Sequence, residues 1–234
     1  MRDKIIYFLE FIGGLLILLF FQNYALNVLG NFGINLNNFS TNIVMIVFFL
    51  IQVLLCVILY FIYKGMIKQN GNAFKNHFLK NLLYSLLILA VMTVVMNIAS
   101  YFINYVANMF GITVYEEIKF NILQTNISLE YILNLIKFAI LIPFSSVVVY
   151  VLSVERLFRK SGVKIIMSGL IWSLIEAFNF TPNLLNMFFN VLSTFILGVF
   201  LSYIYSRNKN IWYPIVIYGL YLLFSPLLIG YLGW

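Results

Sequence analysis

Seven long apolar runs, joined by short polar segments, constrain this chain more than any other feature of its sequence. The runs cover residues 5–28, 42–63, 82–106, 132–153, 165–180, 184–205 and 212–232. A helix needs about 20 residues to cross the ~30 Å hydrocarbon core of a bilayer, and only the fifth run is short for this task. The runs are apolar on all sides, whereas the helices of soluble proteins keep a polar face. The sequence therefore predicts an all-α fold, a polytopic membrane helix bundle with about seven transmembrane helices.

Composition excludes several classes of protein. The chain is 63% hydrophobic and only 9% charged, which rules out a soluble domain of this size. The net charge of +7 follows from the basic ends of the helices, so we expect no nucleic acid partner. One histidine, His77, and one cysteine, Cys56, cannot supply a zinc site of His and Cys ligands. We expect no metal and no cofactor.

The basic residues are distributed unevenly along the chain. Four clusters hold 12 of the 14 lysines and arginines: Arg2 and Lys4; Lys64, Lys68, Lys75 and Lys80; Arg156, Arg159, Lys160 and Lys164; Arg207 and Lys209. Seven spans place all four clusters on one side of the membrane, which the positive-inside rule makes cytoplasmic. This predicts a cytoplasmic N-terminus and a C-terminus outside.

Glycine and turn residues give the expected connections. Asn70-Gly71 and Gly162 predict turns between helices. Gly13-Gly14 and Gly169 predict places where two helices approach closely, as small residues allow in membranes. We divide the chain into 1–131, with three helices and an outer loop, and 132–234, with the remaining helices, within a single membrane domain.

Ionisable residues inside the apolar runs are costly unless they are paired, so each is a candidate for function. Glu155 and Arg159 are four residues apart, and we expect them to share one face of a helix. Glu176 interrupts the fifth run, and its expected partner is Arg159 or one of Asn190, Ser193 and Thr194. Two interpretations of these residues are open. They form a polar network that only holds helices together, or they belong to a catalytic or ligand-binding site.

Three short motifs carry a resemblance to a known family. They are Val154-Glu155-Arg156-Leu157-Phe158-Arg159, Trp172-Ser173-Leu174-Ile175-Glu176 and Tyr218-Gly219-Leu220-Tyr221-Leu222. Their order and spacing over about 140–232, with a Trp-x-Pro turn at 212–214, resemble the CAAX-protease and bacteriocin-processing family of intramembrane proteins. The motifs of that family are Glu-Glu-x-x-x-Arg, Phe-x-x-x-His and His-x-x-x-Asn, on successive membrane helices.

The resemblance implies a CAAX-protease-like core, a fold described as a glutamate-dependent, metal-independent intramembrane peptidase. Here, however, Val154 replaces the first Glu, Glu176 and Tyr218 replace the two His residues, and Leu222 replaces Asn. Valine cannot activate water, and tyrosine is a poor general base near neutral pH. We therefore expect a proteolytically inactive member, a pseudoprotease.

Three hypotheses for function follow. In the first, the former active site is a cavity that binds a membrane helix, a peptide or a lipid, and the protein is a scaffold or regulator of a membrane or cell-envelope partner protein. Its residues would be Glu155, Arg159, Trp172, Glu176, Asn190 and Tyr218. In the second, Glu155 and Glu176 still poise a water, and the protein is an active peptidase in peptide processing or bacteriocin self-immunity.

The third hypothesis is a small transporter or channel subunit, and the absence of paired broken helices in the sequence argues against it. The family resemblance and a composition rich in Asn, Ile and Lys imply the plasma (inner) membrane of a bacterium.

Overall fold

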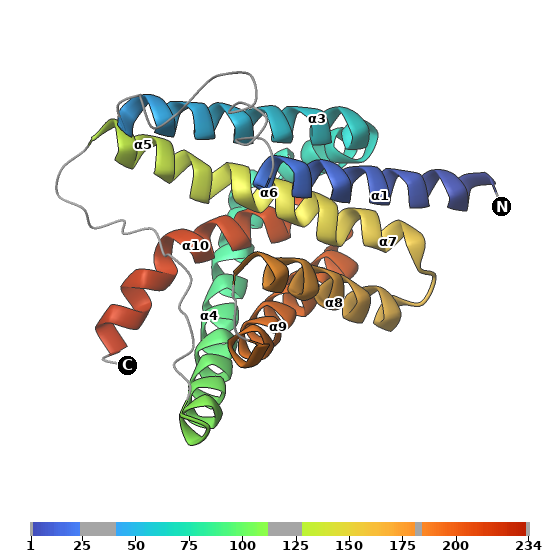
Figure 1. The fold of residues 1–234 in the computed structure, drawn as a ribbon. Helices are drawn as coiled ribbons and strands as arrows, with labels where there is room; N and C mark the ends of the chain where they lie inside the picture. Colours follow the sequence, from blue (N-terminus) through green and yellow to red (C-terminus); the bar gives the residue numbers. More distant parts are fainter. Residues whose placement is uncertain (1, 24–40, 112–127, 181–183, 233–234) are drawn as a thin grey trace.

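The computed structural model describes residues 2–23, 41–111, 128–180 and 184–232. Side chains are described over the same ranges, apart from residues 2–3, 22–23, 41, 176–180, 184–186, 190 and 225–232. The long helices are α1 (Arg2–Asn23), α3 (Thr41–Lys75), α4 (Phe78–Met109), the run Leu129–Leu157, α8 (Ser161–Phe180), α9 (Leu184–Asn208) and α10 (Trp212–Leu232) (Figure 1). The described residues contain no strand, and the predicted all-α fold is confirmed.

The helices have the length and composition of membrane spans. Five windows are long and apolar enough to cross a bilayer: Lys4–Phe21, Asn42–Lys75, Phe78–Met109, Leu129–Leu157 and Met187–Asn208. Two shorter apolar stretches, Ser161–Ile175 and Trp212–Phe224, lie in α8 and α10. Large apolar side chains face outward, as lipid contact requires; on α4, Leu87 is 64% exposed and Ile98 66%. The chain is a multi-pass membrane protein.

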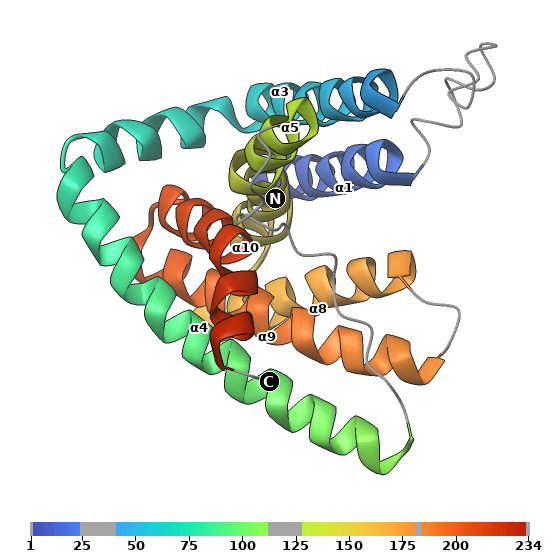
Figure 2. The ribbon, with the colours of Figure 1, turned by 90° about the vertical axis from the view of Figure 1, so that its left-hand side faces the viewer.

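One hydrophobic core joins all the long helices. Leu18 of α1, Leu59 of α3 and Met92 of α4 belong to the same buried cluster as Trp172 of α8 and Ile217 of α10. In Figure 2, α8 and α9 lie next to each other below α1 and α3, while α4 crosses the bundle obliquely. The core includes residues from both sides of position 131, so the two parts of the chain pack as a single unit.

The run Leu129–Leu157, called here the central helix, occupies the middle of the bundle. It consists of α5 (Leu129–Ile136), the π-helical segment η2 (Lys137–Leu141), α6 (Ile142–Val147), the π-helical segment η3 (Val148–Leu152) and α7 (Ser153–Leu157). All residues from 143 to 154 are buried. Single π turns inside α-helices are frequent at functional sites, and Pro143 explains part of the irregularity because it has no N–H to donate along the helix.

Close contacts at two places show why glycine is required there. A Cβ at Gly169 of α8 would lie 2.6 Å from Val199 Cγ2, and one at Gly198 of α9 would lie 2.9 Å from the Cα of Gly169. A Cβ at Gly219 of α10 would lie 2.3 Å from the carbonyl oxygen of Ala139. In a regular α-helix, the N–H of residue 143 would donate to that carbonyl, and proline lacks it.

The prediction for Gly169 is therefore confirmed. Gly14 also packs closely, since an added Cβ would lie 2.9 Å from the hydroxyl oxygen of Tyr63. The prediction for Gly13 is wrong, because open space surrounds it.

The structure also corrects both predicted turns. Helix α3 continues through Asn70 and Gly71 to Lys75, and the turn lies at Asn76 and His77. The side chain of Asn70 donates to the carbonyl of Met66, one turn earlier in the same helix, and so stays within helical geometry. Gly162 lies in the first turn of α8, after the break between the two helices.

Candidate functional site

The motif at the end of the central helix does not continue as a helix. Helix α7 ends at Leu157, and Phe158 is extended, with φ −106° and ψ 148°. Glu155 and Arg159 therefore do not share a helical face, and this prediction is wrong. The chain has to reverse direction before α8 begins at Ser161, and it does so by leaving the helix at Phe158. Arg159 is exposed on this turn.

Glu155 connects three parts of the chain through one carboxylate oxygen. Its Oε1 accepts hydrogen bonds from Lys164 Nζ of α8 at 2.9 Å and from Lys209 Nζ, after α9, at 2.8 Å. The side chains of Glu155 and Lys164 are 11% and 16% exposed, whereas that of Lys209 is 61% exposed. Glu155 Oε2 is buried and has no hydrogen bond partner among the described residues. Lys209 has φ +51°, a left-handed conformation uncommon outside glycine.

Arg156, the next residue, holds α1 against the central helix. Its guanidinium forms an ion pair with Glu10 and lies 4.4 Å from the centre of the Tyr7 ring. The hydroxyl of Tyr63 on α3 donates to the backbone carbonyl of Glu10 at 2.9 Å. Sequence reasoning missed this pair, although an acid inside the first apolar run and an arginine within the motif were both visible.

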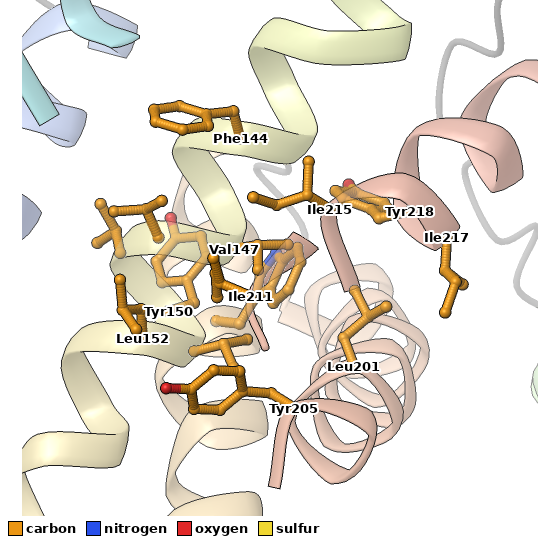
Figure 3. Close-up of a cluster of buried hydrophobic side chains, with 14 of the residues drawn as sticks. Phe144, Val147, Tyr150, Leu152, Leu201, Tyr205, Ile211, Ile215, Ile217 and Tyr218 are labelled. Carbon is orange, nitrogen blue, oxygen red and sulfur yellow. The ribbon is translucent and has the colours of Figure 1, made fainter. Parts of the chain in front are cut away.

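Three aromatic rings gather at the second and third motifs. Trp172 of α8 is 1% exposed and stacks on Tyr150 of the central helix, with ring centroids 5.1 Å apart. Tyr218 of α10 also contacts Trp172, edge to face, with ring centroids 5.3 Å apart. Figure 3 shows Tyr150 and Tyr218 among the apolar side chains of the core. The structure therefore brings Trp172 and Tyr218 together, and it adds Tyr150, which sequence reasoning missed.

The remaining motif positions are apolar or lie outside the described side chains. Val154 is 0% exposed, and Leu222 is half-buried against the same core. The backbones of Glu176 and Asn190 are helical, in α8 and α9, and their side chains are outside the described residues.

Among the described residues, no three His, Cys, Asp or Glu side chains form a group that could hold a metal ion. The described part of the site packs aromatic and aliphatic groups together, and its ionised residues tie helices to one another. Lys164 and Lys209 donate hydrogen bonds to Glu155 and hold its carboxylate in place.

The Trp-x-Pro turn forms a second set of ties at the same end of the bundle. Asn210 donates to the carbonyl of Asn70 at 2.9 Å and accepts from the backbone N–H of Trp212 at 3.0 Å, which caps the start of α10. The hydroxyl of Tyr213 donates to Asn81 Oδ1 at 2.7 Å, and Asn81 donates to the carbonyl of Phe74 at 2.7 Å. This turn therefore fixes the α3–α4 corner.

Fold and site together define a multi-pass helical membrane protein. The residues of the first motif lie at one end of the helix bundle, and Trp172 and Tyr218 of the other two motifs lie in its core. The family model described as "Type II CAAX prenyl endopeptidase Rce1-like" matches residues 97–224, more than half of the chain. The chain belongs to this family, as the motifs indicated, and carries its membrane protease domain. The match begins within α4, before the division expected at residue 131. No curated protein and no solved structure matches the chain.

Proposed function

We propose that this protein is a catalytically inactive member of its family that acts as a scaffold or regulator of a membrane or cell-envelope partner protein. The observation that carries the proposal is the packing at the motif positions. Tyr150, Trp172 and Tyr218 form a buried aromatic cluster, and Val154 is fully buried. Val154 and Tyr218 occupy the positions to which the motifs assign the water-activating acid and one histidine. Valine and a buried tyrosine leave these two positions without a general base near neutral pH.

The engagement of Glu155 supports the same conclusion. Peptide hydrolysis needs a base that can take a proton from water and return to its resting state. The Oε1 atom of Glu155 already accepts two hydrogen bonds from ammonium groups, so this oxygen is bound to lysines of the protein itself. On this proposal, the retained motif glutamate is a structural residue that joins α7, α8 and the end of α9.

A cleavage assay tests the proposal. The purified protein, reconstituted in liposomes, is incubated with a prenylated CAAX peptide beside an active family member as the positive control. We expect no cleavage above the protein-free background. Cleavage by the wild-type protein that Glu176→Gln abolishes would overturn the proposal.

The scaffold role has its own test, which is purification in mild detergent followed by mass spectrometry of the proteins that co-purify. A membrane or envelope protein present in stoichiometric amount supports the role. Arg156→Gln removes the ion pair that holds α1, and Lys64→Gln is the control. Loss of the partner in the first variant and its retention in the second would show that the partner binds the packed helices of the bundle. A protein that purifies alone argues against a stable partner.

The alternative is an active glutamate-dependent peptidase involved in peptide processing or bacteriocin self-immunity. The buried Glu155 Oε2, which has no hydrogen bond partner among the described residues, favours it because a second oxygen of this carboxylate remains available. This alternative requires that a Glu155→Gln, Glu176→Gln double variant lose all function. The Lys209→Gln variant, which removes one of the two lysines bonded to Oε1, should keep or raise it.

We further propose that the protein resides in a bacterial plasma membrane, with the N-terminus in the cytoplasm and the C-terminus outside. All four basic clusters support this orientation. Reporter fusions that are active on only one side of the membrane test it at each terminus. A C-terminal reporter active in the cytoplasm would refute the orientation.

A further inference from the structure

A cavity lies between α3 and the first turns of the central helix, at the end of the bundle opposite the basic turns. Its volume is about 200 Å³. Met45, Phe48, Phe49, Glu130, Leu133, Asn134 and Lys137 line it. The site is separate from the three motifs, and the proposed function does not use it.

The polar residues of this cavity follow one face of one helix. Glu130, Asn134 and Lys137 are at positions i, i+4 and i+7, which lie on the same side over two turns. Glu130 is exposed in the first turn of α5, whereas Asn134 and Lys137 are half-buried. Lys137 is also the first residue of the π-helical segment η2, and π turns are frequent at functional sites. The wall therefore presents an acid, an amide and an amine in that order.

Lys137 forms no ion pair with the other described residues. It lies within the span Leu129–Leu157, and its ammonium group is 5.7 Å from the centre of the Phe138 ring. None of the ion pairs formed among the described residues includes Lys137, although Glu130 lines the same cavity. An ammonium group inside a membrane span is costly unless an anion or water neutralises it. Glu130 and Lys137 line one cavity without forming an ion pair with each other. This arrangement suits a ligand that carries both a cation and an anion.

The opposite wall is apolar and partly exposed. Phe48 is 44% exposed, and Met45 and Phe49 are half-buried on the same helix, α3. An acyl chain can lie along such a surface, whereas a free, water-soluble ion gains nothing from it.

We propose that this cavity binds an aminophospholipid, with its phosphate on Lys137 and Asn134, its amine toward Glu130 and an acyl chain along Met45 and Phe48. The headgroup then supplies both the anion that Lys137 lacks and a cation for Glu130. The charge order of the wall sets the direction in which the headgroup lies.

Native mass spectrometry of the detergent-solubilised protein tests the site with phosphatidylethanolamine, phosphatidylglycerol of the same acyl chains, and free phosphoethanolamine. We expect phosphatidylethanolamine to bind best, and Lys137→Met to weaken its binding at least tenfold. Lys64→Met is the matched control, because Lys64 also lies over a phenylalanine, 6.0 Å from the Phe61 ring centre, yet outside the cavity. It should change binding by less than twofold.

A second variant keeps the test independent of folding. Glu130→Gln alters an exposed residue, and it should reduce the preference for phosphatidylethanolamine over phosphatidylglycerol while leaving the thermal unfolding temperature unchanged. Equal phosphatidylethanolamine binding by wild type and Lys137→Met would overturn the proposal. So would phosphatidylglycerol binding that matches phosphatidylethanolamine binding in the wild type, or displacement of the lipid by an equimolar amount of free phosphoethanolamine.

Discussion

Replacing Gly219 by alanine is a direct test of how α10 packs on the central helix. The added Cβ would lie 2.3 Å from the Ala139 oxygen, and ordinary contact begins near 3.4 Å, so α10 has to retreat by about 1 Å. The neighbour is backbone, which cannot rotate away as a side chain can. Overpacking of this kind costs about 1–3 kcal/mol, and a rigid neighbour favours the upper half of that range. The retreat also moves Tyr218, the preceding residue, away from Trp172.

Thermal unfolding in detergent, followed by circular dichroism at the helix band, measures the effect. For a chain of this length, ~2–3 kcal/mol corresponds to a fall in Tm of roughly 5–10 °C. Gly13→Ala is the matched control, because no atom lies within 4 Å of its added Cβ and alanine favours a helix over glycine by about 1 kcal/mol. Its Tm should stay the same or rise. A Gly219→Ala protein as stable as wild type would refute the close contact, and equal losses in both variants would show that the contact with Ala139 is not the cause.

Two further predictions concern the ties at the basic end of the bundle. Lys164→Met should destabilise the protein by about 2 kcal/mol in denaturant unfolding, because its ion pair with Glu155 is nearly buried. Lys209→Met should cost less than about 1 kcal/mol in the same assay, because the Lys209 side chain is 61% exposed, and equal losses in the two variants would contradict this difference. Tyr213→Phe should cost about 1–2 kcal/mol in the same assay because it removes the hydroxyl bonded to Asn81, a residue 8% exposed, and unchanged stability would contradict this role.

The helices were predictable because membrane thickness fixes their length and lipid fixes their composition. Each of the seven apolar runs overlaps a long helix of the structure. The error at α3 arose where the helix leaves the hydrocarbon, since hydropathy then carries no signal. Gly71 stays helical there, with an added Cβ 3.1 Å from Trp212 Nε1, and that tertiary contact involves a residue 141 positions away in the sequence.

The site was predictable only in part. The family resemblance assigned Trp172 and Tyr218 to one site, and their rings are in contact although they lie on different helices. The prediction that Glu155 and Arg159 share a helical face was wrong, because it extended the helix past Leu157, where the chain turns. The pair with Lys209, 54 residues from Glu155, depends on a left-handed residue at the end of α9, and local propensity does not predict that conformation for lysine.

The changes at the motif positions depend on one another physically. A glutamate in place of Val154 would enter a site that is 0% exposed, where an unpaired carboxylate costs several kcal/mol or stays protonated. To activate water it would also need room for a water molecule, and the preceding residues of the central helix, 143–153, are all buried. Restoring one acid would therefore destabilise this core before it provided a base. The proposal of an inactive protein therefore rests on the buried packing at the motif positions as well as on the missing glutamate.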